Sequence, residues 1–265
     1  MSDGVSRRVA CATMVTSPSY VIGALVLGYS LRKIGWSRET VVMVSPEISP
    51  RDRERLALLW DRLVDIDHVP NPVPTRDLVL VSFSHCYTKL RMWELTEYDR
   101  VIYLDADTVV LGSLDELINA PEFAAAPCVT APDQLCAAVM VIKPSKEMFA
   151  DLVSKIGKLP SYDGSDQGFI NSYFNDWFTG PPERRLPLKY NTPRILSLFK
   201  PAWDRFAADM GVLHYFGPKK PWDFGASLMP FLMSLLAPSK LPDPSPQTIW
   251  TNLRKEMEQA CPQVR

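Results

Sequence analysis

RVIYLDADTVVLGSLDE, residues 100–116, carries the strongest structural signal in this 265-residue chain. Its first half, 101–104, is a short β-branched and aromatic run, which predicts a strand buried on both faces of a parallel sheet. The run ends at Asp105-Ala106-Asp107, and an apolar pattern resumes at 108–111 before Gly112. If the chain stays extended there, the two carboxylates lie on the same side of it.

Two carboxylates at the carboxyl end of a buried strand are costly unless a positive charge holds them. A hard divalent cation bound together with substrate phosphates is the expected partner, and open α/β sheets bind ligands at this end of their strands. The bare pattern is weak, because 19 aspartates in 265 residues give about one Asp-x-Asp by chance. A second copy, Asp65-Ile66-Asp67, lies in a polar, proline-broken stretch that favours a solvated surface.

Composition predicts an ordinary globular chain with 46% hydrophobic and 22% charged residues. A net charge of −1 argues against nucleic-acid binding through bulk electrostatics. The longest apolar run, 21–31, is broken by glycine and serine, and the first residues lack a signal-peptide profile, so we expect no membrane partner. Five cysteines without metal-binding spacing favour free thiols and a cytoplasmic location.

Strand and helix signals alternate along the first part of the chain. Strands are predicted at 8–16, 39–45 and 63–69, and helices at 20–33 and 49–60. This order predicts an α/β fold with a parallel, doubly wound sheet. We predict one domain over 1–224 and a helical extension over 225–265 packed on it. The other expected elements are helices at 87–96, 145–156, 169–174 and 247–260, strands at 136–142 and 212–216, an extended piece at 186–191 and an irregular stretch at 121–135.

Polar side chains gather at the ends of otherwise apolar strands in three places. These are Asp105 with Asp107, Asp163 with Asp166 and Gln167, and His214 with Lys220. Two aspartates and one imidazole suit manganese. A nearby lysine and the cation together neutralise a diphosphate leaving group. The alternatives without a function are a buried, satisfied histidine at 214, a turn cap at 163 and a core aromatic at Tyr20.

Four stretches resemble family 8 glycosyltransferases, and the glycogenin group in particular. They are TSPSYVIGALVLGYSLRK (16–33), YTKLRMWELTEYDRVIYLDADTVVLGSLDEL (87–117), SYDGSDQGFIN (161–171) and VLHYFGPKKPW (212–222). The resemblance covers about residues 8–224. It implies a GT-A (Rossmann-like) fold, a UDP-sugar donor, Mn²⁺ and retention of configuration at the anomeric carbon.

The resemblance also assigns roles to individual residues. Asp105, Asp107 and His214 match the metal ligands, and Gly217 and Lys220 match the diphosphate-binding motif. Thr16, Ser17 and Tyr20 match residues at the uridine, Lys89 matches one near the phosphate and sugar, and Asp163 matches one at the hexose. Ala106 is a further donor-binding residue, and Asp166, Gln167 and Lys220 are the catalytic candidates.

Two departures from the family pattern refine the prediction. Cys136-Ala137-Ala138 stands where relatives carry an Asn-Ser/Ala-Gly strand start, which removes an amide near the donor sugar. The segment 194–200 contains no tyrosine, so we do not expect self-glucosylation. The resemblance then implies α-transfer of galactose, in preference to glucose, to a separate glycan or glycoprotein, as in a cytoplasmic enzyme that extends a glycan on a ubiquitin-ligase subunit.

Two alternatives and one partner stay open at this stage. The first alternative is a galactinol-synthase-like transfer of galactose to a small polyol. The second is a catalytically weak UDP-sugar-binding scaffold, which the Cys136-Ala137-Ala138 departure favours. The apolar stretch Leu228 to Leu236 is a candidate homodimer surface, and it is equally a candidate for packing within the chain.

Overall fold

A six-stranded sheet forms the centre of the computed structural model, which describes residues 7–74, 81–223 and 244–265. The strand order is β3-β2-β1-β4-β7-β6. The first four strands are parallel, and β7 and β6 are antiparallel to their neighbours. The predicted α/β fold with a mostly parallel sheet is therefore confirmed. The strands are β1 (Val9–Val15), β2 (Glu39–Val44), β3 (Arg62–Asp65), β4 (Arg100–Leu104), β6 (Phe123–Pro127) and β7 (Leu135–Ile142).

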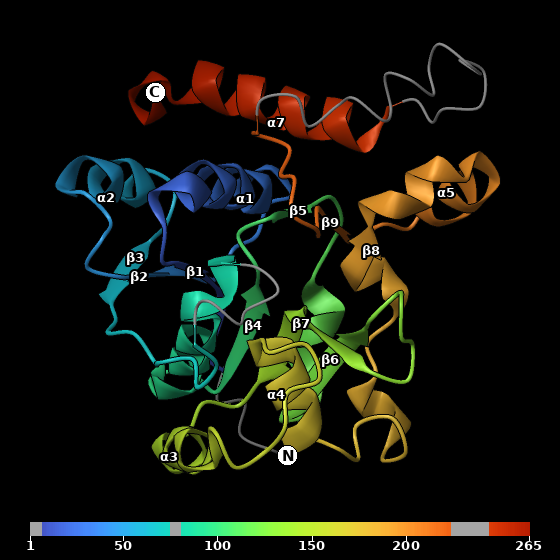
Figure 1. The fold of residues 1–265 in the computed structure, drawn as a ribbon. Helices are drawn as coiled ribbons and strands as arrows, with labels where there is room; N and C mark the ends of the chain where they lie inside the picture. The colour runs from blue at the N-terminus through green and yellow to red at the C-terminus, as the bar shows by residue number, and fades with distance from the viewer. Residues whose placement is uncertain (1–6, 75–80, 224–243) are drawn as a thin grey trace, which may run out of the picture.

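Both faces of the sheet are buried, as the apolar run of β4 predicted. Val101 and Tyr103 pack on one side, and Ile102 and Leu104 pack on the other. The two sides are covered by different helices (Figure 1). The helices are α1 (Val21–Lys33), α2 (Pro50–Ala57) and α7 (Pro246–Ala260) over one face, and η3 (Val81–Glu94, 3-10), α3 (Lys146–Lys155) and α4 (Asp166–Tyr173) over the other.

Serine side chains cap the N-termini of four helices. The hydroxyls of Ser49, Ser145, Ser165 and Ser245 each accept a backbone N–H from the first turn of α2, α3, α4 and α7. Such a cap contributes about 1 kcal/mol to helix stability. Ser165 has a further consequence, because it fixes the start of α4 at Asp166, one of the predicted site residues.

A second, three-stranded sheet lies beside the first and has the order β5-β9-β8. Its strands are β5 (Thr108–Val110), β9 (Val212–His214) and β8 (Thr192–Pro193). The chain leaves β4, turns, and enters β5, and β5 pairs antiparallel with β9 so that Thr108 stands opposite His214. This pairing brings the end of the 212–214 strand to the carboxyl end of β4.

Helix α1 packs unusually close to the turn that follows β4. A Cβ atom on Gly23 would lie 2.4 Å from the carbonyl oxygen of Ala106 and 2.7 Å from the Trp222 ring, so a larger residue does not fit there. On the outer side of α1, helix α7 buries Trp250 and Met257 against the same core (Figure 1). The 105–107 turn is thus held between the sheet and α1.

Several predicted elements differ from the structure. Of the predicted helix 87–96, residues 87–94 belong to the 3-10 segment η3, and 186–191 is not extended but contains the 3-10 turn η6 (Leu188–Asn191). The stretch 121–135 contains strand β6, whose alanine-rich sequence has little strand propensity and is held by pairing with β7. Elements without a prediction are α5 (Lys200–Ala207) and the 3-10 turns η1 (Pro18–Tyr20), η4 (Asp115–Asn119), η5 (Pro182–Arg184), η7 (Arg194–Leu198) and η9 (Pro262–Val264).

The remaining sequence predictions concern membranes and partners. Among the described residues, none of the helices has the length and apolar character that crossing a bilayer requires. The apolar stretch Leu228 to Leu236, the predicted dimer surface, lies outside the described residues.

Candidate active site

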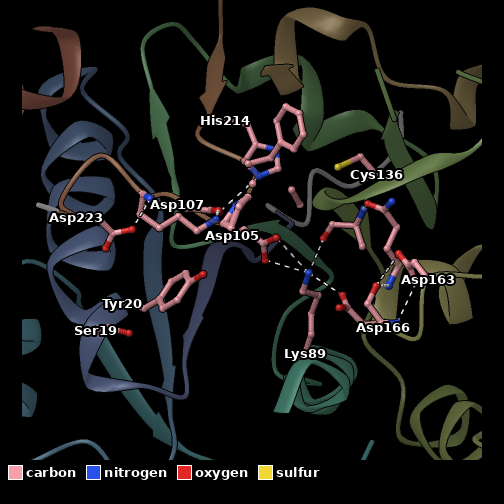
Figure 2. Close-up of a pocket in the computed structure, with 18 of the residues that line it drawn as sticks. Ser19, Tyr20, Lys89, Asp105, Asp107, Cys136, Asp163, Asp166, His214 and Asp223 are labelled. Atoms are coloured by element: carbon pink, nitrogen blue, oxygen red, sulfur yellow. Dashed lines mark hydrogen bonds and ion pairs between the residues drawn. The ribbon is translucent and has the colours of Figure 1, made fainter. Parts of the chain in front are cut away.

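A cavity of about 510 Å³ opens where the direction of strand order reverses in the central sheet. The chain runs from β1 outward through β2 and β3, and then returns to place β4 on the other side of β1. In open α/β sheets, ligands bind in the crevice at such a switch point, outside the carboxyl ends of the strands. Figure 2 shows Ser19 and Tyr20 at one end of this cavity, Asp163 and Asp166 at the other, and Asp107 between them.

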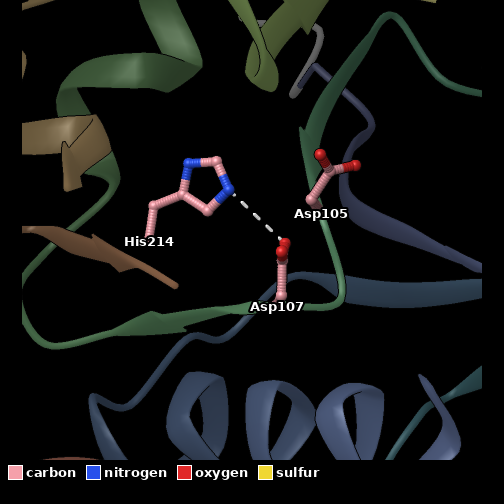
Figure 3. Close-up of side chains that lie close together, drawn as sticks. All are labelled: Asp105, Asp107 and His214. Atoms are coloured by element: carbon pink, nitrogen blue, oxygen red, sulfur yellow. Dashed lines mark ion pairs between the residues drawn. The ribbon is translucent and has the colours of Figure 1, made fainter. Parts of the chain in front are cut away.

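Asp105, Asp107 and His214 converge in the middle of the cavity (Figure 3). Each offers one ligand atom, and these atoms lie within 4.8 Å of one another. The sequence analysis considered a chain that stays extended after β4, but the structure has a turn there. Thr108 closes this turn by donating its N–H to the Asp105 carbonyl at 3.0 Å. The convergence therefore comes from this turn and from the β5–β9 pairing, not from strand alternation.

Asn191 orients the imidazole of His214. The Asn191 Nδ2 donates to the Pro127 carbonyl at 3.3 Å, so its Oδ1 faces His214 Nδ1 at 2.9 Å and accepts the proton there. The second nitrogen, Nε2, points to Asp107 Oδ1 at 3.5 Å. This is the outer hydrogen bond by which proteins fix the tautomer of a metal-binding histidine. Asn191 was not predicted, because it lies 23 residues from His214 in a segment without a motif.

The Asp107 carboxylate is buried between two cations. Lys220 Nζ lies 2.5 Å from Asp107 Oδ2, and His214 lies on the side of Oδ1. Burial alone would raise the pKa of Asp107, but His214 and Lys220 hold it well below its usual value. Burial likewise lowers the pKa of His214, and the Asp107 carboxylate outweighs burial and raises this pKa to about 10. These three side chains thus form a buried, charged group.

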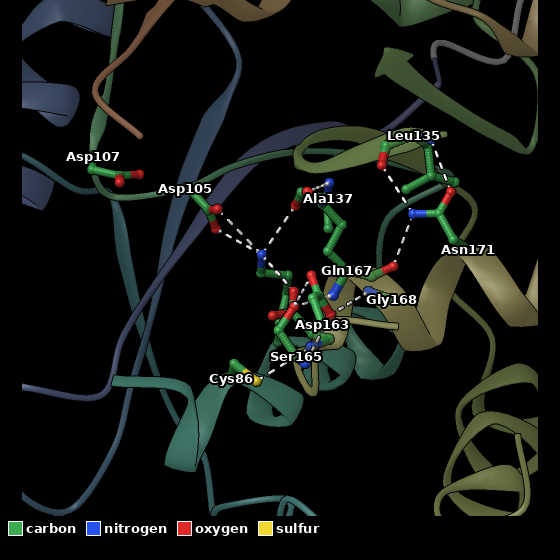
Figure 4. Close-up of polar contacts among 12 residues, drawn as sticks. Cys86, Asp105, Asp107, Leu135, Ala137, Asp163, Ser165, Gln167, Gly168 and Asn171 are labelled. Atoms are coloured by element: carbon green, nitrogen blue, oxygen red, sulfur yellow. Dashed lines mark hydrogen bonds and ion pairs between the residues drawn. The ribbon is translucent and has the colours of Figure 1, made fainter. Parts of the chain in front are cut away.

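Lys89 holds two carboxylates at the far end of the cavity (Figure 2), and Figure 4 shows two of its partners, Asp105 and Ala137. Its Nζ lies 3.0 Å from Asp105 Oδ1 and 2.7 Å from Asp166 Oδ2, and it donates to the Ala137 carbonyl at 3.1 Å. The ammonium group is thus surrounded by two carboxylates and one carbonyl oxygen. Burial and the nearby Asp105 carboxylate raise the pKa of Asp166, and Lys89 lowers it without cancelling the rise. Cys86 adds support, because its Sγ accepts the Asp166 backbone N–H at 3.2 Å.

Asp163 combines a structural role with a place in the cavity wall. Its Oδ1 accepts hydrogen bonds from the Ser161 hydroxyl and from the backbone N–H groups of Ser165 and Gly168, and its Oδ2 accepts from the Ser165 hydroxyl at 2.8 Å. The turn-cap interpretation of Asp163 therefore describes most of its contacts. One lone pair on Oδ2 remains for a ligand in the cavity.

Gln167 is fixed at both ends of its amide. Its Oε1 accepts the Ala137 N–H at 3.3 Å, and its Nε2 donates to the Tyr162 hydroxyl at 3.1 Å. Tyr162 was not singled out from the sequence, although the residue is 58% exposed and contacts Gln167 in the cavity wall. The part of the cavity wall next to Gln167 is formed by Cys136, Ala137 and Ala138.

Tyr20 closes the other end of the cavity. Its ring packs edge-on against Trp222, with centroids 5.5 Å apart, and Lys220 Nζ lies 5.7 Å from its centroid. A flat, fixed aromatic ring beside a cation suits a base and its phosphates. Ser19, which the sequence analysis did not single out, also lines this end.

The structure brings ten of the predicted site residues into one cavity. These are Tyr20, Lys89, Asp105, Asp107, Asp163, Asp166, Gln167, His214, Gly217 and Lys220. Thr16, Ser17 and Ala106 are not part of its wall. The second Asp-x-Asp copy lies elsewhere, at the end of the edge strand β3, where Asp65 pairs with Arg53 and its side chain is 82% exposed.

Comparison with known proteins agrees with this geometry. The family model "Glycosyl transferase family 8" matches residues 11–226. Glycogenin-1 from Oryctolagus cuniculus is 35% identical over 219 residues, which cover 81% of this chain and 66% of that protein. Inositol phosphorylceramide glucuronosyltransferase 1 from Arabidopsis thaliana is 30% identical over 278 residues, which cover 97% of this chain and 48% of that protein.

Solved structures support the fold. The galactosyltransferase LgtC, in complex with donor and acceptor sugar analogues, superposes with a TM-score of 0.63 at 17% identity and covers 93% of this chain and 95% of its own. The chain spans 44% to 66% of the length of the glycogenins from Homo sapiens and Oryctolagus cuniculus that it matches. On the family match and these relatives, the chain belongs to glycosyl transferase family 8.

Proposed function

We propose that this chain is a Mn²⁺-dependent, retaining hexosyltransferase. In this proposal it moves a hexose, galactose in preference to glucose, from a UDP-sugar to a separate glycan or glycoprotein in an α linkage. The observation that carries the proposal is the convergence of Asp105, Asp107 and His214, with Lys220 beside them, in the cavity of a family 8 chain. The five free cysteines support a reducing, cytoplasmic location.

The donor set fits a manganese ion. Two carboxylates and one imidazole are the mixed oxygen and nitrogen ligands that Mn²⁺ accepts, and the 4.8 Å limit on their separation is near that of ligands sharing one ion. Asn191 holds the proton on Nδ1 of His214, so Nε2 is the nitrogen that gives up its proton and binds the ion. When bound, the cation supplies Lewis-acid stabilisation of the charge on the diphosphate.

The remaining roles follow from the positions of the side chains along the cavity. Tyr20 stacks on the uracil, and Lys220 offsets the charge that grows on the departing UDP. Asp166 and Gln167 flank the anomeric carbon at the other end. Lys89 keeps Asp166 in an ion pair, which makes this carboxylate a poor nucleophile.

This ion pair favours same-face attack over a covalent enzyme intermediate. The acceptor hydroxyl oxygen forms its bond to the anomeric carbon on the face from which the diphosphate oxygen departs. As that carbon–oxygen bond breaks, the departing phosphate oxygen takes the proton of the acceptor hydroxyl. The segment 194–200 has no tyrosine to serve as its own acceptor, so the acceptor is a separate molecule.

Donor hydrolysis and its metal dependence test the proposal. We expect UDP-galactose to be hydrolysed faster than UDP-glucose with Mn²⁺, activity to disappear with EDTA, and excess Mn²⁺ to restore it. Transfer is then assayed with glucoside acceptors and with inositol, where an inositol product identifies the polyol alternative. Tight calorimetric binding of UDP and Mn²⁺ without hydrolysis or transfer identifies the scaffold alternative, which the apolar wall at Cys136, Ala137 and Ala138 favours.

The role of Asn191 gives a second prediction. Asn191→Leu removes the hydrogen bond that orients His214, and we expect Mn²⁺ affinity to fall about 10- to 100-fold. The matched control is Asn171→Leu, which removes a buried amide that binds the backbone of Leu135 and contacts no metal ligand. Both variants lower the melting temperature, but only the first weakens Mn²⁺ in calorimetry. Equal Mn²⁺ affinity in the two variants contradicts the orienting role.

A further inference from the structure

Arg194 lies behind the turn that carries Gly217 and Lys220. It follows β8 directly, and the parallel pairing of Pro193 with His214 sets it alongside the chain that enters this turn. Its Nη2 donates to the Lys219 carbonyl at 2.5 Å. A Cβ atom placed on Gly217, whose φ is +102°, would lie 3.6 Å from the same nitrogen.

The turn itself faces the cavity. Gly217 and Lys220 both line it, and the positive φ of Gly217 is one that other residues rarely adopt. The Lys220 N–H donates to Asp223 Oδ2 at 2.7 Å at the end of the turn. Arg194 therefore holds the middle of a turn whose two ends present a backbone group and an ammonium group to the ligand.

Placing the charged guanidinium of Arg194 behind the turn costs part of its hydration. It is half-buried, and burial lowers its pKa. The nearby carboxylates are Asp107 and Asp223, and both already have partners. Asp107 pairs with Lys220 and His214, and Asp223 accepts the backbone N–H of Lys220. Within the described part of the chain, Arg194 has a carbonyl partner but no ion pair. A half-buried cation without an anion is stabilised when an anion arrives nearby.

We propose that Arg194 is a positioning residue for the diphosphate of the donor. Through the Lys219 carbonyl it sets the turn before the nucleotide binds, and its Nη2 lies beside Gly217 and Lys219 of that turn. The inference rests on the proposed function only in taking a uridine diphosphate as the ligand. Arg194 does not belong to the cavity wall, so it acts through the turn and not by direct contact.

Nucleotides that differ by one phosphate test this role. We expect Arg194→Met to weaken UDP binding about tenfold in calorimetry with Mn²⁺, the loss typical of a hydrogen bond from a charged group. Binding of UMP, which lacks the β-phosphate, should change less than twofold. Arg194→Lys should restore most of the UDP affinity, and Arg194→Gln, which keeps a donor without the charge, should restore part of it.

A double variant shows whether the effect passes through the turn. If Arg194 acts by placing Lys220, then Arg194→Met adds little to the loss caused by Lys220→Met, and the two effects are not additive. Arg185→Met is the matched control. Arg185 also ties a loop through backbone carbonyls, those of Phe178 and Gly180, and is not part of the cavity wall.

The outcomes separate the two proposals. Equal losses for UDP and UMP, or a loss matched by Arg185→Met, indicate a general structural effect and overturn the role of Arg194. Unchanged UDP affinity in Arg194→Met overturns it as well. If the unaltered protein fails to bind UDP at all, the proposed function is wrong, and the role of Arg194 fails with it.

Discussion

Asp107→Asn should abolish donor turnover and destabilise the protein at the same time. The change removes one metal ligand, so we expect Mn²⁺-dependent hydrolysis to fall by more than about 100-fold. A loss of about 100-fold is the largest that is typical when a residue that only orients a metal ligand is mutated. It also leaves His214 and Lys220 buried without their shared counter-charge. Removing one partner from such a group costs about 3–5 kcal/mol of unfolding free energy. Hydrolysis assays and urea unfolding measure the two effects.

The second Asp-x-Asp copy provides the control. In Asp65→Asn the lost ion pair with Arg53 is at the surface, where such pairs contribute about 0–1 kcal/mol. We expect this variant to keep full Mn²⁺-dependent turnover and nearly full stability. Full turnover in Asp107→Asn would remove the metal site from the proposal, whatever the stability shows.

The central sheet could be predicted because its strands carry long apolar signals. The stretch 101–104 is buried on both faces, and the helices at 49–60 and 145–156 begin at serines that the structure shows as caps. The second sheet was predicted only in part. A strand was expected at 212–216, where β9 lies, but β8 had no prediction and the pairing of β5 with β9 was not foreseen, because strands of two and three residues are too short to show a period.

The site was predictable where a chemical motif marks it and not where tertiary contacts make it. Their strand-end positions suggested that His214, Asp105 and Asp107 share a metal, and the family resemblance matched all three to its ligands. What joins them in the structure is the register of two short strands, which the sequence does not show. Asn191 and Arg194 act on His214 and on the 217–220 turn through single hydrogen bonds across 23 and 25 residues of sequence. Contacts of this kind leave no local pattern.

The same distinction applies to Lys89, whose position near the cleft was expected but whose double ion pair was not. Its ammonium group lies between Asp105 and Asp166, and the three side chains come from η3, the end of β4 and the start of α4. Two carboxylates at this depth repel each other strongly when no cation stands between them. Lys89 therefore keeps Asp105 and Asp166 in place in the cavity, in addition to its expected contact with the donor.

Lys89→Met is accordingly expected to lower the unfolding free energy by about 3–5 kcal/mol, because two carboxylates lose their common partner. Turnover should fall by more than about 100-fold, since Asp105 and Asp166 are both displaced from the donor. Adding Asp166→Asn removes one of the repelling charges, so the double variant should regain part of the stability but none of the turnover. Lys143→Met, which breaks an exposed pair with Glu122, should change neither quantity. Unfolding in urea, with hydrolysis of UDP-galactose measured on the same samples, distinguishes these results, and unchanged stability in Lys89→Met would show that Asp105 and Asp166 do not depend on its charge.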